Sequence, residues 1–220
     1  MTGLAAKRVA DVIMAFGLLV LLSPLMLGIA LWLALAQGRP ILFASERMKT
    51  ADSGFTLLKF RTMRTVAADS GVSGGDKAGR ITGPGRILRR YRLDELPQLI
   101  NILRGDISFV GPRPPLRRYV QMFPELYGRV LRVPPGVTGL ATLVFHRREE
   151  ALLAACTTPA ETEAVYIRRC IPVKANLDLI YARERTLCWD IWLMFATVIR
   201  RLPTRRKARP SWATAKKTSK

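Results

Sequence analysis

The sequence predicts an α+β, mostly helical domain that is associated with a membrane, and three observations support this prediction. A long apolar stretch near the start, residues 12–36, contains no ionisable side chain. Short strand-like runs flank a turn at residues 52–54, and the second half of the chain is largely helical in pattern. We therefore divide the 220 residues into a membrane helix at 1–37, a globular domain at 38–202 and a tail at 203–220.

Composition limits the partners more than the fold. Hydrophobic residues make up 49% of the chain, enough for a packed core, and the formal net charge is +20. Such a surplus indicates anionic partners: nucleic acid, an anionic lipid leaflet or phosphorylated substrates. Three scattered cysteines without CxxC or metal-ligand spacing argue against a disulfide framework. The basic tail at 203–220 is expected to be disordered or to lie on anionic lipid.

The apolar stretch at 12–36 is long enough to cross a bilayer, since a straight helix of this length measures roughly 37 Å. A signal peptide is one alternative, with Lys7 and Arg8 before the run, but the run exceeds an ordinary signal core. A transmembrane anchor is another. Ser23-Pro24 lies near the midpoint, where proline removes a backbone donor and a serine hydroxyl can satisfy the freed carbonyl. The pair therefore predicts a sharp bend.

Positive charge on both sides of this stretch leaves its topology open. Lys7 and Arg8 precede it, and Arg39, Arg47 and Lys49 follow it. Because both flanks are basic, the charges do not choose an orientation for a spanning helix. They fit a helix-break-helix hairpin that enters one leaflet and returns to the same side. The residues alone leave span and hairpin as equal alternatives.

The segments with strand character predict a small sheet. Two runs around the turn at 52–54 favour a β-hairpin. Residues 67–79 are rich in Gly, Ser, Ala and Asp, which is typical of a mobile loop. Residues 107–110 form a short strand candidate. We interpret residues 132–145 as a loop followed by a buried strand.

The remainder of the chain is helical in pattern. Thr158-Pro159 is a cap followed by proline and predicts the start of a helix. A longer helix is expected from about Lys174 through the apolar run LCWDIWLMFATVI. That run is too short to span a bilayer, so Trp189 and Trp192 indicate either an amphipathic interfacial helix or core packing.

Asp94 and Glu95 are the best catalytic candidates. We predict Asp94 as a helix cap, with Glu95 and Pro97 in the first turn, where proline is tolerated. Apolar residues then recur at helical spacing up to Gly105, a stop signal. A helix N-terminus attracts phosphate, and adjacent helical side chains point about 100° apart. One carboxylate can therefore face a phosphorus atom while the other holds a hard cation, although acids are ordinary at helix starts.

Arginines around this acidic pair favour a phosphorylated ligand. Five of them precede the pair without an intervening acid: Arg80, Arg86, Arg89, Arg90 and Arg92. Arg113 follows, pinned between two prolines. Fixed guanidinium groups beside carboxylates suit a diphosphate, which needs bidentate contacts and charge neutralisation. A cationic face on a membrane protein is the plain alternative.

Other chemical signatures are missing from the sequence. It has neither a GxGxxG after a strand nor a GxxxxGK[ST] motif, which argues against dinucleotide and P-loop folds. We interpret the single histidine, His146, as a surface or loop residue. No RRM, KH, helix-turn-helix or zinc-finger signature accompanies the charge, so nucleic-acid binding is disfavoured. A non-catalytic scaffold would not need the intact acidic pair.

Six motifs in fixed order resemble the bacterial sugar transferase family, the monotopic phosphoglycosyl transferases. They are KR..D at 7–11, Ser23-Pro24, KFRTM at 59–63, LDELPQL at 93–99, GDISFVGPRP at 105–114 and PGVTGLA at 135–141. The resemblance covers nearly the whole chain and implies the minimal form of the family. One departure is the stretch from Thr142 to His146, where many members have a Gln-Val-Asn-Gly type sequence. The identity of the sugar therefore stays open.

The resemblance implies a reaction and a role for each site residue. Asp94 is expected to attack the sugar-bearing phosphate of a UDP-sugar and release UMP, after which polyprenyl (undecaprenyl) phosphate displaces Asp94. Glu95 is expected to bind Mg²⁺, which neutralises the diphosphate. Arg89 and Arg113 would hold phosphates, and Lys59 would line the site. This reaction is the first membrane step of exopolysaccharide or glycoconjugate synthesis.

The resemblance also implies a location. The break at Ser23-Pro24 would make the membrane segment re-entrant, and Asp11 with Arg8 would lock it to the globular part. The catalytic domain is then expected on the cytoplasmic face of the bacterial inner membrane, against an anionic leaflet and assisted by amphipathic helices. Expected partners are UDP-sugar and polyprenyl phosphate but not nucleic acid, and a homo-oligomer is compatible with the resemblance.

Overall fold

The computed structural model describes residues 2–66, 72 and 74–199, which form a mostly helical domain with two small sheets. In chain order its helices and strands are α1 (Thr2–Gln37), β1 (Leu42–Met48), β2 (Gly54–Phe60), α2 (Gly83–Tyr91), α3 (Gln98–Arg104), β3 (Ser108–Val110), α4 (Arg117–Met122), α5 (Pro124–Val130), β4 (Gly136–Thr138), α6 (Leu140–Ala154), α7 (Pro159–Val165), α8 (Ile171–Glu184) and α9 (Leu187–Ile199). Two 3₁₀ turns, Gly75–Arg80 and Leu93–Glu95, and a π-helical turn, Tyr166–Cys170, complete the described chain.

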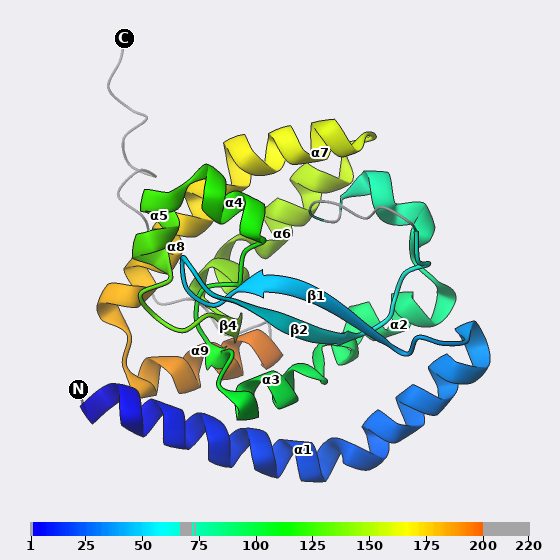
Figure 1. Ribbon diagram of the computed structural model, residues 1–220, viewed down its shortest axis with the longest axis horizontal. Helices are drawn as coiled ribbons and strands as arrows, with labels where there is room; N and C mark the ends of the chain where they lie inside the picture. The colour runs from blue at the N-terminus through cyan, green and yellow to red at the C-terminus, as the bar shows by residue number, and fades with distance from the viewer. Residues whose placement is uncertain (1, 67–71, 73, 200–220) are drawn as a thin grey trace.

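Helix α1 runs along one side of the domain and bends near its middle (Figure 1). Within the part of the chain that the structure describes, it is the one helix long and apolar enough to cross a membrane. Pro24 lies inside it, and the Ser23 hydroxyl donates a hydrogen bond to the Val20 carbonyl at 2.8 Å. Val20 is four residues before Pro24, so the serine replaces the backbone donor that proline lacks. The expected break is therefore a bend within one continuous helix, and re-entrant insertion stays a prediction.

The first half of α1 is fastened to the globular part by polar contacts. The Lys7 ammonium forms a buried ion pair with Asp190 of α9 at 2.5 Å. The Arg8 guanidinium donates hydrogen bonds to the carbonyls of Ile102 and Leu103, at the C-terminal end of α3. Carbonyls at a helix C-terminus carry partial negative charge, so a cationic side chain is well suited to them. Asp11 accepts a hydrogen bond of 3.5 Å from the backbone N–H of Phe109 in β3.

Two buried clusters show that α1 also contributes to the core. Ala15 packs with β2 and α3 in a buried cluster of Ala15, Leu57, Leu99, Ile102 and Ile107. Farther along the helix, Ile29 and Leu33 pack with Phe60 and Leu88. Most other apolar side chains of α1 are exposed, among them Leu21 and Leu35, which are 72% and 80% exposed. One stripe of the helix therefore faces the domain, and the rest presents apolar surface.

The two sheets position the site. Strands β1 and β2 form the predicted antiparallel hairpin, with Leu42 opposite Phe60 and Met48 opposite Gly54. Strand β3, also predicted, pairs in parallel with β4, and the crossover between them contains α4 and α5. Glycine is required at Gly136, since a Cβ there would meet the backbone nitrogen of Gly111 at 2.1 Å.

The predictions for three segments need correction: residues 140–145, the helix from Lys174 and the loop at 67–79. The predicted buried strand does not reach residue 145. It ends with β4 at Thr138, because α6 begins at Leu140. The buried side chains of its first two turns, Leu140, Ala141 and Phe145, share one helical face. The long helix from Lys174 is two helices, α8 and α9, and Thr186 caps the second by accepting a hydrogen bond from the Trp189 N–H.

The predicted loop at 67–79 is structured in its last part, where the 3₁₀ turn Gly75–Arg80 begins. Residues 67–71 and 73 lie outside the described residues, as does the predicted tail at 203–220. The helix start at Thr158-Pro159 is confirmed, since the Thr158 hydroxyl accepts a hydrogen bond from the Glu161 N–H at 3.2 Å.

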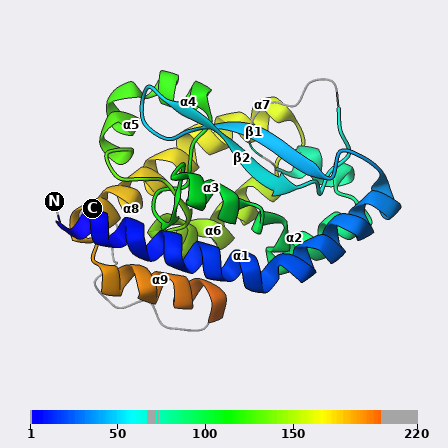
Figure 2. The same cartoon turned by 60° about the horizontal axis from the view of Figure 1, so that its bottom comes forward.

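Helix α9 has one buried face and one exposed apolar face. Leu193 and Ala196 are buried, and Trp189 and Trp192 pack partly buried against the main core. The exposed side carries Leu187, Ile191, Phe195 and Ile199, which recur every four residues. Figure 2 shows α9 beside the first half of α1, consistent with the ion pair between Lys7 and Asp190. The two helices thus present apolar surface on neighbouring parts of the molecule.

Candidate active site

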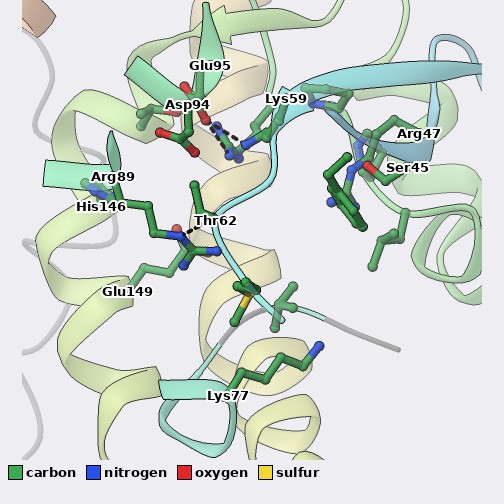
Figure 3. Close-up of a pocket in the computed structure, with 18 of the residues that line it drawn as sticks. Ser45, Arg47, Lys59, Thr62, Lys77, Arg89, Asp94, Glu95, His146 and Glu149 are labelled. Carbon is green, nitrogen blue, oxygen red and sulfur yellow. Dashed lines mark hydrogen bonds and ion pairs between the residues drawn. The ribbon is translucent and has the colours of Figure 1, made fainter. Parts of the chain in front are cut away.

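A cavity of about 630 Å³ lies between the β1–β2 hairpin, the 3₁₀ turn Leu93–Glu95 and helices α6 and α8. Its lining includes all five residues predicted to act on substrate: Lys59, Arg89, Asp94, Glu95 and Arg113. Four of these are labelled in Figure 3, where the carboxylates of Asp94 and Glu95 lie near the Lys59 side chain. The structure therefore brings together residues that are far apart in the sequence, since 54 positions separate Lys59 from Arg113.

The acidic pair, Asp94 and Glu95, sits in the connection between α2 and α3 rather than at a helix cap. Arg92 adopts a left-handed conformation with φ of 56° and ends α2. The next three residues wind into the 3₁₀ turn, and α3 starts only at Gln98, with Pro97 in the capping position. The prediction of Asp94 as N-cap is thus wrong, because the tight turn comes between the acid and the helix. Gly105 does end α3, with φ of 83°.

Glu95 is held ionised by three cations. Its Oε1 atom lies 2.8 Å from the Lys59 ammonium and 3.1 Å from the Arg113 guanidinium, and its Oε2 atom lies 3.5 Å from Arg92. Burial alone would raise the pKa of Glu95, but Lys59, Arg113 and Arg92 outweigh it and hold the pKa well below its usual range. Glu95 therefore stays a carboxylate throughout the physiological pH range.

Asp94 has a different environment although it is the next residue. It is buried and makes no ion pair among the residues that the structure describes. Burial raises its pKa above the usual value, and the neighbouring Glu95 charge raises it further, while Lys59 and Arg89 act in the opposite direction. A desolvated carboxylate without an ion-pair partner is available to react with a phosphorus atom.

The predicted cations come from three separate elements. Lys59 is on β2, and burial lowers its pKa against the opposing effect of Glu95. Arg89 is on α2, where its Nε–H donates to the Thr62 hydroxyl at 2.9 Å and so orients the guanidinium. Arg113 follows β3, and the Glu95 charge raises its pKa. Oriented guanidinium groups of this kind suit the oxygens of phosphate or diphosphate.

Several cavity-lining residues were not singled out as site residues from the sequence. Arg47 adds positive charge, and burial, together with Arg113, lowers its pKa to about 10. A second group, which we call the polar cluster, consists of Glu149, Tyr166, Lys174 and Asp178. They lie on α6, the π-helical turn and α8. The sequence contains one signal for this cluster. Lys174 and Asp178 are four residues apart, so on a helix they lie on the same face.

His146 lies on a helix, so the prediction of a loop residue is wrong, while its side chain is partly exposed. It lies on α6, and its half-buried side chain lines the cavity, with Nε2 3.1 Å from the Glu150 carboxylate. Burial and then the nearby Arg92 lower its pKa. The prediction failed because residues 140–145 were read as a strand, which left the next residue outside any element.

The oxygen donors of the site allow only a sparse protein coordination of the expected magnesium ion. Among the described residues, no group of three or more His, Cys, Asp or Glu side chains is arranged to hold a metal. Mg²⁺ is commonly bound by only one or two carboxylates, with substrate phosphates and water completing its shell. Asp94 and Glu95 provide such oxygens beside cations suited to phosphate. The residues therefore fit an ion that is shared with a bound diphosphate.

Buried paired carboxylates among oriented cations suit phosphorylated ligands, and the domain that holds them has an exposed apolar helix long enough to cross a membrane. The chain belongs to the bacterial sugar transferase family, whose family model matches residues 2–203. The resemblance drawn from the motifs is thereby confirmed.

Named relatives agree with this family. A UDP-N-acetylgalactosamine-undecaprenyl-phosphate N-acetylgalactosaminephosphotransferase of Aeromonas hydrophila is 30% identical over 87% of this chain and 42% of the relative. A UDP-glucose:undecaprenyl-phosphate glucose-1-phosphate transferase of Caulobacter vibrioides is 36% identical over 90% of this chain and 68% of the relative. The exopolysaccharide production protein PSS of Rhizobium leguminosarum bv. phaseoli is 34% identical over 90% and 96%. The chain thus spans less than half of the first relative's length.

Proposed function

We propose that this protein transfers a sugar-1-phosphate from a UDP-sugar to undecaprenyl phosphate, or a similar polyprenyl phosphate, and releases UMP. The observation that carries the proposal is the contrast within the acidic pair: Asp94 is buried without an ion-pair partner, while Glu95 is held by three cations. The names of the relatives supply the substrate classes. The reaction would be the first membrane step of exopolysaccharide or glycoconjugate synthesis, which agrees with the name of the Rhizobium relative.

The donor diphosphate would bind among the cations of the cavity. Arg89 is already oriented by Thr62, and Arg113 is pinned between Pro112 and Pro114. Guanidinium groups held in this way lose little freedom on binding a diphosphate and neutralise its charge. They would place the sugar-bearing phosphorus next to the Asp94 carboxylate.

In the first step an Asp94 oxygen attacks the sugar-bearing phosphorus. A new P–O bond to Asp94 forms as the P–O bond to UMP breaks, and UMP leaves with the electron pair. The cations around the site stabilise the charge that develops on the leaving phosphate. The sugar keeps its own C–O bond throughout, so its anomeric configuration does not change.

In the second step an oxygen of polyprenyl phosphate attacks the same phosphorus. The bond to Asp94 breaks, the carboxylate is regenerated, and the product is a polyprenyl diphosphate sugar. Each step is an in-line displacement, in which the attacking and leaving oxygens lie on opposite sides of phosphorus. The polyprenyl phosphate therefore occupies the position that UMP has left.

A magnesium ion is part of the proposal, with Glu95 as its protein ligand. When bound to the donor, Mg²⁺ would neutralise diphosphate charge and act as a Lewis acid. Glu95 suits this role because it stays ionised, and Lys59 and Arg113 keep its carboxylate in a fixed place.

The domain would lie on the cytoplasmic face of the bacterial inner membrane, with α1 inserted as a re-entrant helix. Apolar side chains exposed on α1 and α9 support membrane contact, as do Ile87 and Tyr91 of α2. Arg89 and Arg90 of the same helix line the cavity. α2 thus offers the lipid-linked acceptor a short path from apolar surface to the acidic pair.

The first experiment is a panel of UDP-sugars incubated with the purified protein, polyprenyl phosphate and Mg²⁺ in membranes or nanodiscs. UMP release that depends on one donor and on the acceptor would support the reaction and name the sugar. Trapping of labelled sugar phosphate on Asp94 in the absence of acceptor would support the covalent step. Silence from folded protein with every UDP-sugar and acceptor would count against the proposal.

A further inference from the structure

We propose that the polar cluster of Glu149, Tyr166, Lys174 and Asp178 recognises the sugar of the donor and holds it through both steps of the reaction. This inference rests on the proposed function. It deepens that function by assigning a specificity site to side chains that take no part in the phosphoryl chemistry. All four residues line the cavity that also contains the acidic pair.

The polar cluster is a built site rather than a chance grouping. The Lys174 ammonium lies 2.7 Å from the Glu149 carboxylate and 3.3 Å from the Tyr166 hydroxyl. It also lies over the Tyr166 ring, 5.1 Å from its centre. Both side chains of the ion pair are mostly buried, 13% exposed for Lys174 and 18% for Glu149. The ammonium is thus fixed from two sides.

Asp178 is the member that lacks a partner. It is 6% exposed, and its Oδ1 atom is fully buried without a hydrogen-bond partner among the described residues. A buried acceptor without a partner costs free energy, so its retention on a cavity wall points to a ligand that donates hydrogen bonds. Burial raises the pKa of Asp178 to about 7, with Lys174 opposing the change.

Charge compensation argues that this ligand is neutral. Lys174 is paired with Glu149, and the nearby Arg113 is paired with Glu95. No cation of the polar cluster is therefore left to neutralise a phosphate, in contrast to the surroundings of Asp94. A carboxyl group, an ammonium and a tyrosine hydroxyl suit the hydroxyl or amide groups of a neutral polar ligand.

Aromatic side chains add apolar surface next to these polar groups. Tyr119 and Tyr127 line the same cavity, and the Tyr119 ring lies 5.0 Å from that of Tyr166. A wall that combines aromatic faces with a few fixed polar groups is common in sites for small ligands. A sugar ring presents both kinds of surface, with C–H groups on its faces and hydroxyls at its edge.

A UDP-sugar has two neutral ends, and the order of the two steps selects the sugar. UMP must leave, and polyprenyl phosphate must then enter from the same side of the phosphorus, since each displacement is in line. The uridine site must therefore be open to the acceptor's path, near α2. The sugar alone stays in place through both steps. A buried and charge-compensated cluster suits the group that does not leave.

The test uses the full-length protein in nanodiscs and a donor that the wild type turns over. Asp178→Asn keeps the shape of the side chain but changes its hydrogen bonding. We expect the KM for the UDP-sugar to rise about 10- to 100-fold. The inhibition constant of UMP, which has no sugar, should change less than about twofold. Tyr166→Phe, a second variant that removes only a hydroxyl, should raise the KM in the same selective way.

Glu184→Gln is the matched control, because Glu184 is exposed at the end of α8 and does not line the cavity. Glu184→Gln should leave the KM for the UDP-sugar and the inhibition constant of UMP unchanged. Thermal unfolding of every variant checks that it is folded. An equal rise in the donor KM and the UMP inhibition constant would overturn the inference in favour of uridine binding. Unchanged constants in both folded variants would overturn it as well. A wild type that releases no UMP from any donor would instead refute the proposed function.

Discussion

The cavity contains two pairs of carboxyl groups that share one design and differ in their surroundings. In each pair, one carboxylate has a fixed cation: Glu95 with Lys59, Arg92 and Arg113, and Glu149 with Lys174. The other carboxyl has no ion pair among the described residues, and burial raises its pKa. The carboxylate with a cation partner fixes the geometry of its pair. The carboxyl group without an ion pair, Asp94 or Asp178, is available to a ligand.

The difference between the pairs lies in the surplus of cations. Around Asp94 the cations outnumber the carboxylates, which suits a diphosphate ligand and a carboxylate that must ionise. Around Asp178 the charges balance and tyrosines are close, which suits a neutral ligand. The same residue type is thus proposed as a nucleophile at one place and a hydrogen-bonding group at the other. The predictions below test this division.

The largest effect is expected from Asp94→Asn. An amide cannot form the covalent bond to phosphorus, so UMP release should fall by about 10⁴-fold or more. Its unfolding midpoint should be no lower than that of the wild type, because the neutral amide relieves a buried charge. Asp178→Asn, measured beside it, should keep most of kcat. Rapid turnover by folded Asp94→Asn protein would exclude Asp94 as nucleophile.

A smaller loss is expected from Glu95→Gln. The amide binds Mg²⁺ weakly and leaves Lys59 and Arg113 without their partner, so kcat should fall by about 10²-fold and more Mg²⁺ should be needed for half-maximal rate. Chelation with EDTA should stop the wild type, and added Mg²⁺ should restore it. A Glu95→Gln enzyme with the wild-type dependence on Mg²⁺ would show that this residue is not the ligand.

The pH profile should report Asp94 rather than Glu95. Asp94 must be ionised to attack, so kcat/KM should fall as pH drops through its pKa, which lies above the ordinary 3.8. Lys59 lowers that pKa, so Lys59→Gln should move the acid limb of the profile to higher pH. Glu95 stays ionised over the same range and should add no limb. A limb that does not move in Lys59→Gln would assign the titration to another group.

The smallest effect concerns stability and Asp178. Its folded pKa of about 7 exceeds the unfolded value near 3.8, so the folded state binds the extra proton between these values. The free energy of unfolding should therefore fall as pH rises from about 4 to 7, by on the order of 1–4 kcal/mol, and then level off. Asp178→Asn should lack this loss and be the more stable protein at pH 8. Thermal unfolding at pH 5 and pH 8, with Glu184→Gln as control, measures the difference.

Much of the local structure could be predicted from single segments. The β1–β2 hairpin, the stop at Gly105 and the cap at Thr158 follow from turn and cap chemistry that acts over a few residues. The strand predicted up to residue 145 failed for a different reason. Residues 140–145 are apolar enough for a buried strand or a buried helix, and only packing against α8 decides for the helix.

The acidic pair and its arginines could be predicted as a group, because Arg89, Arg92, Asp94 and Glu95 are close in the sequence. Arg113 is predicted with them as an arginine held between two prolines, and Lys59 follows only from the resemblance to the family. The polar cluster could not be predicted in this way. Glu149 is 25 residues from Lys174, and the pair meets only because α6 packs against α8.

The sequence by itself determined the apolar α1, the bend at Ser23-Pro24, the basic charge and the motifs of the family, since each depends on neighbouring residues. The tertiary structure alone decided which carboxylates have partners. Burial and the approach of cations from β2 and the turn after β3 are properties of packed elements. Asp94 and Glu95 are adjacent in sequence, yet their pKa values shift in opposite directions, because a charge responds to its surroundings in space.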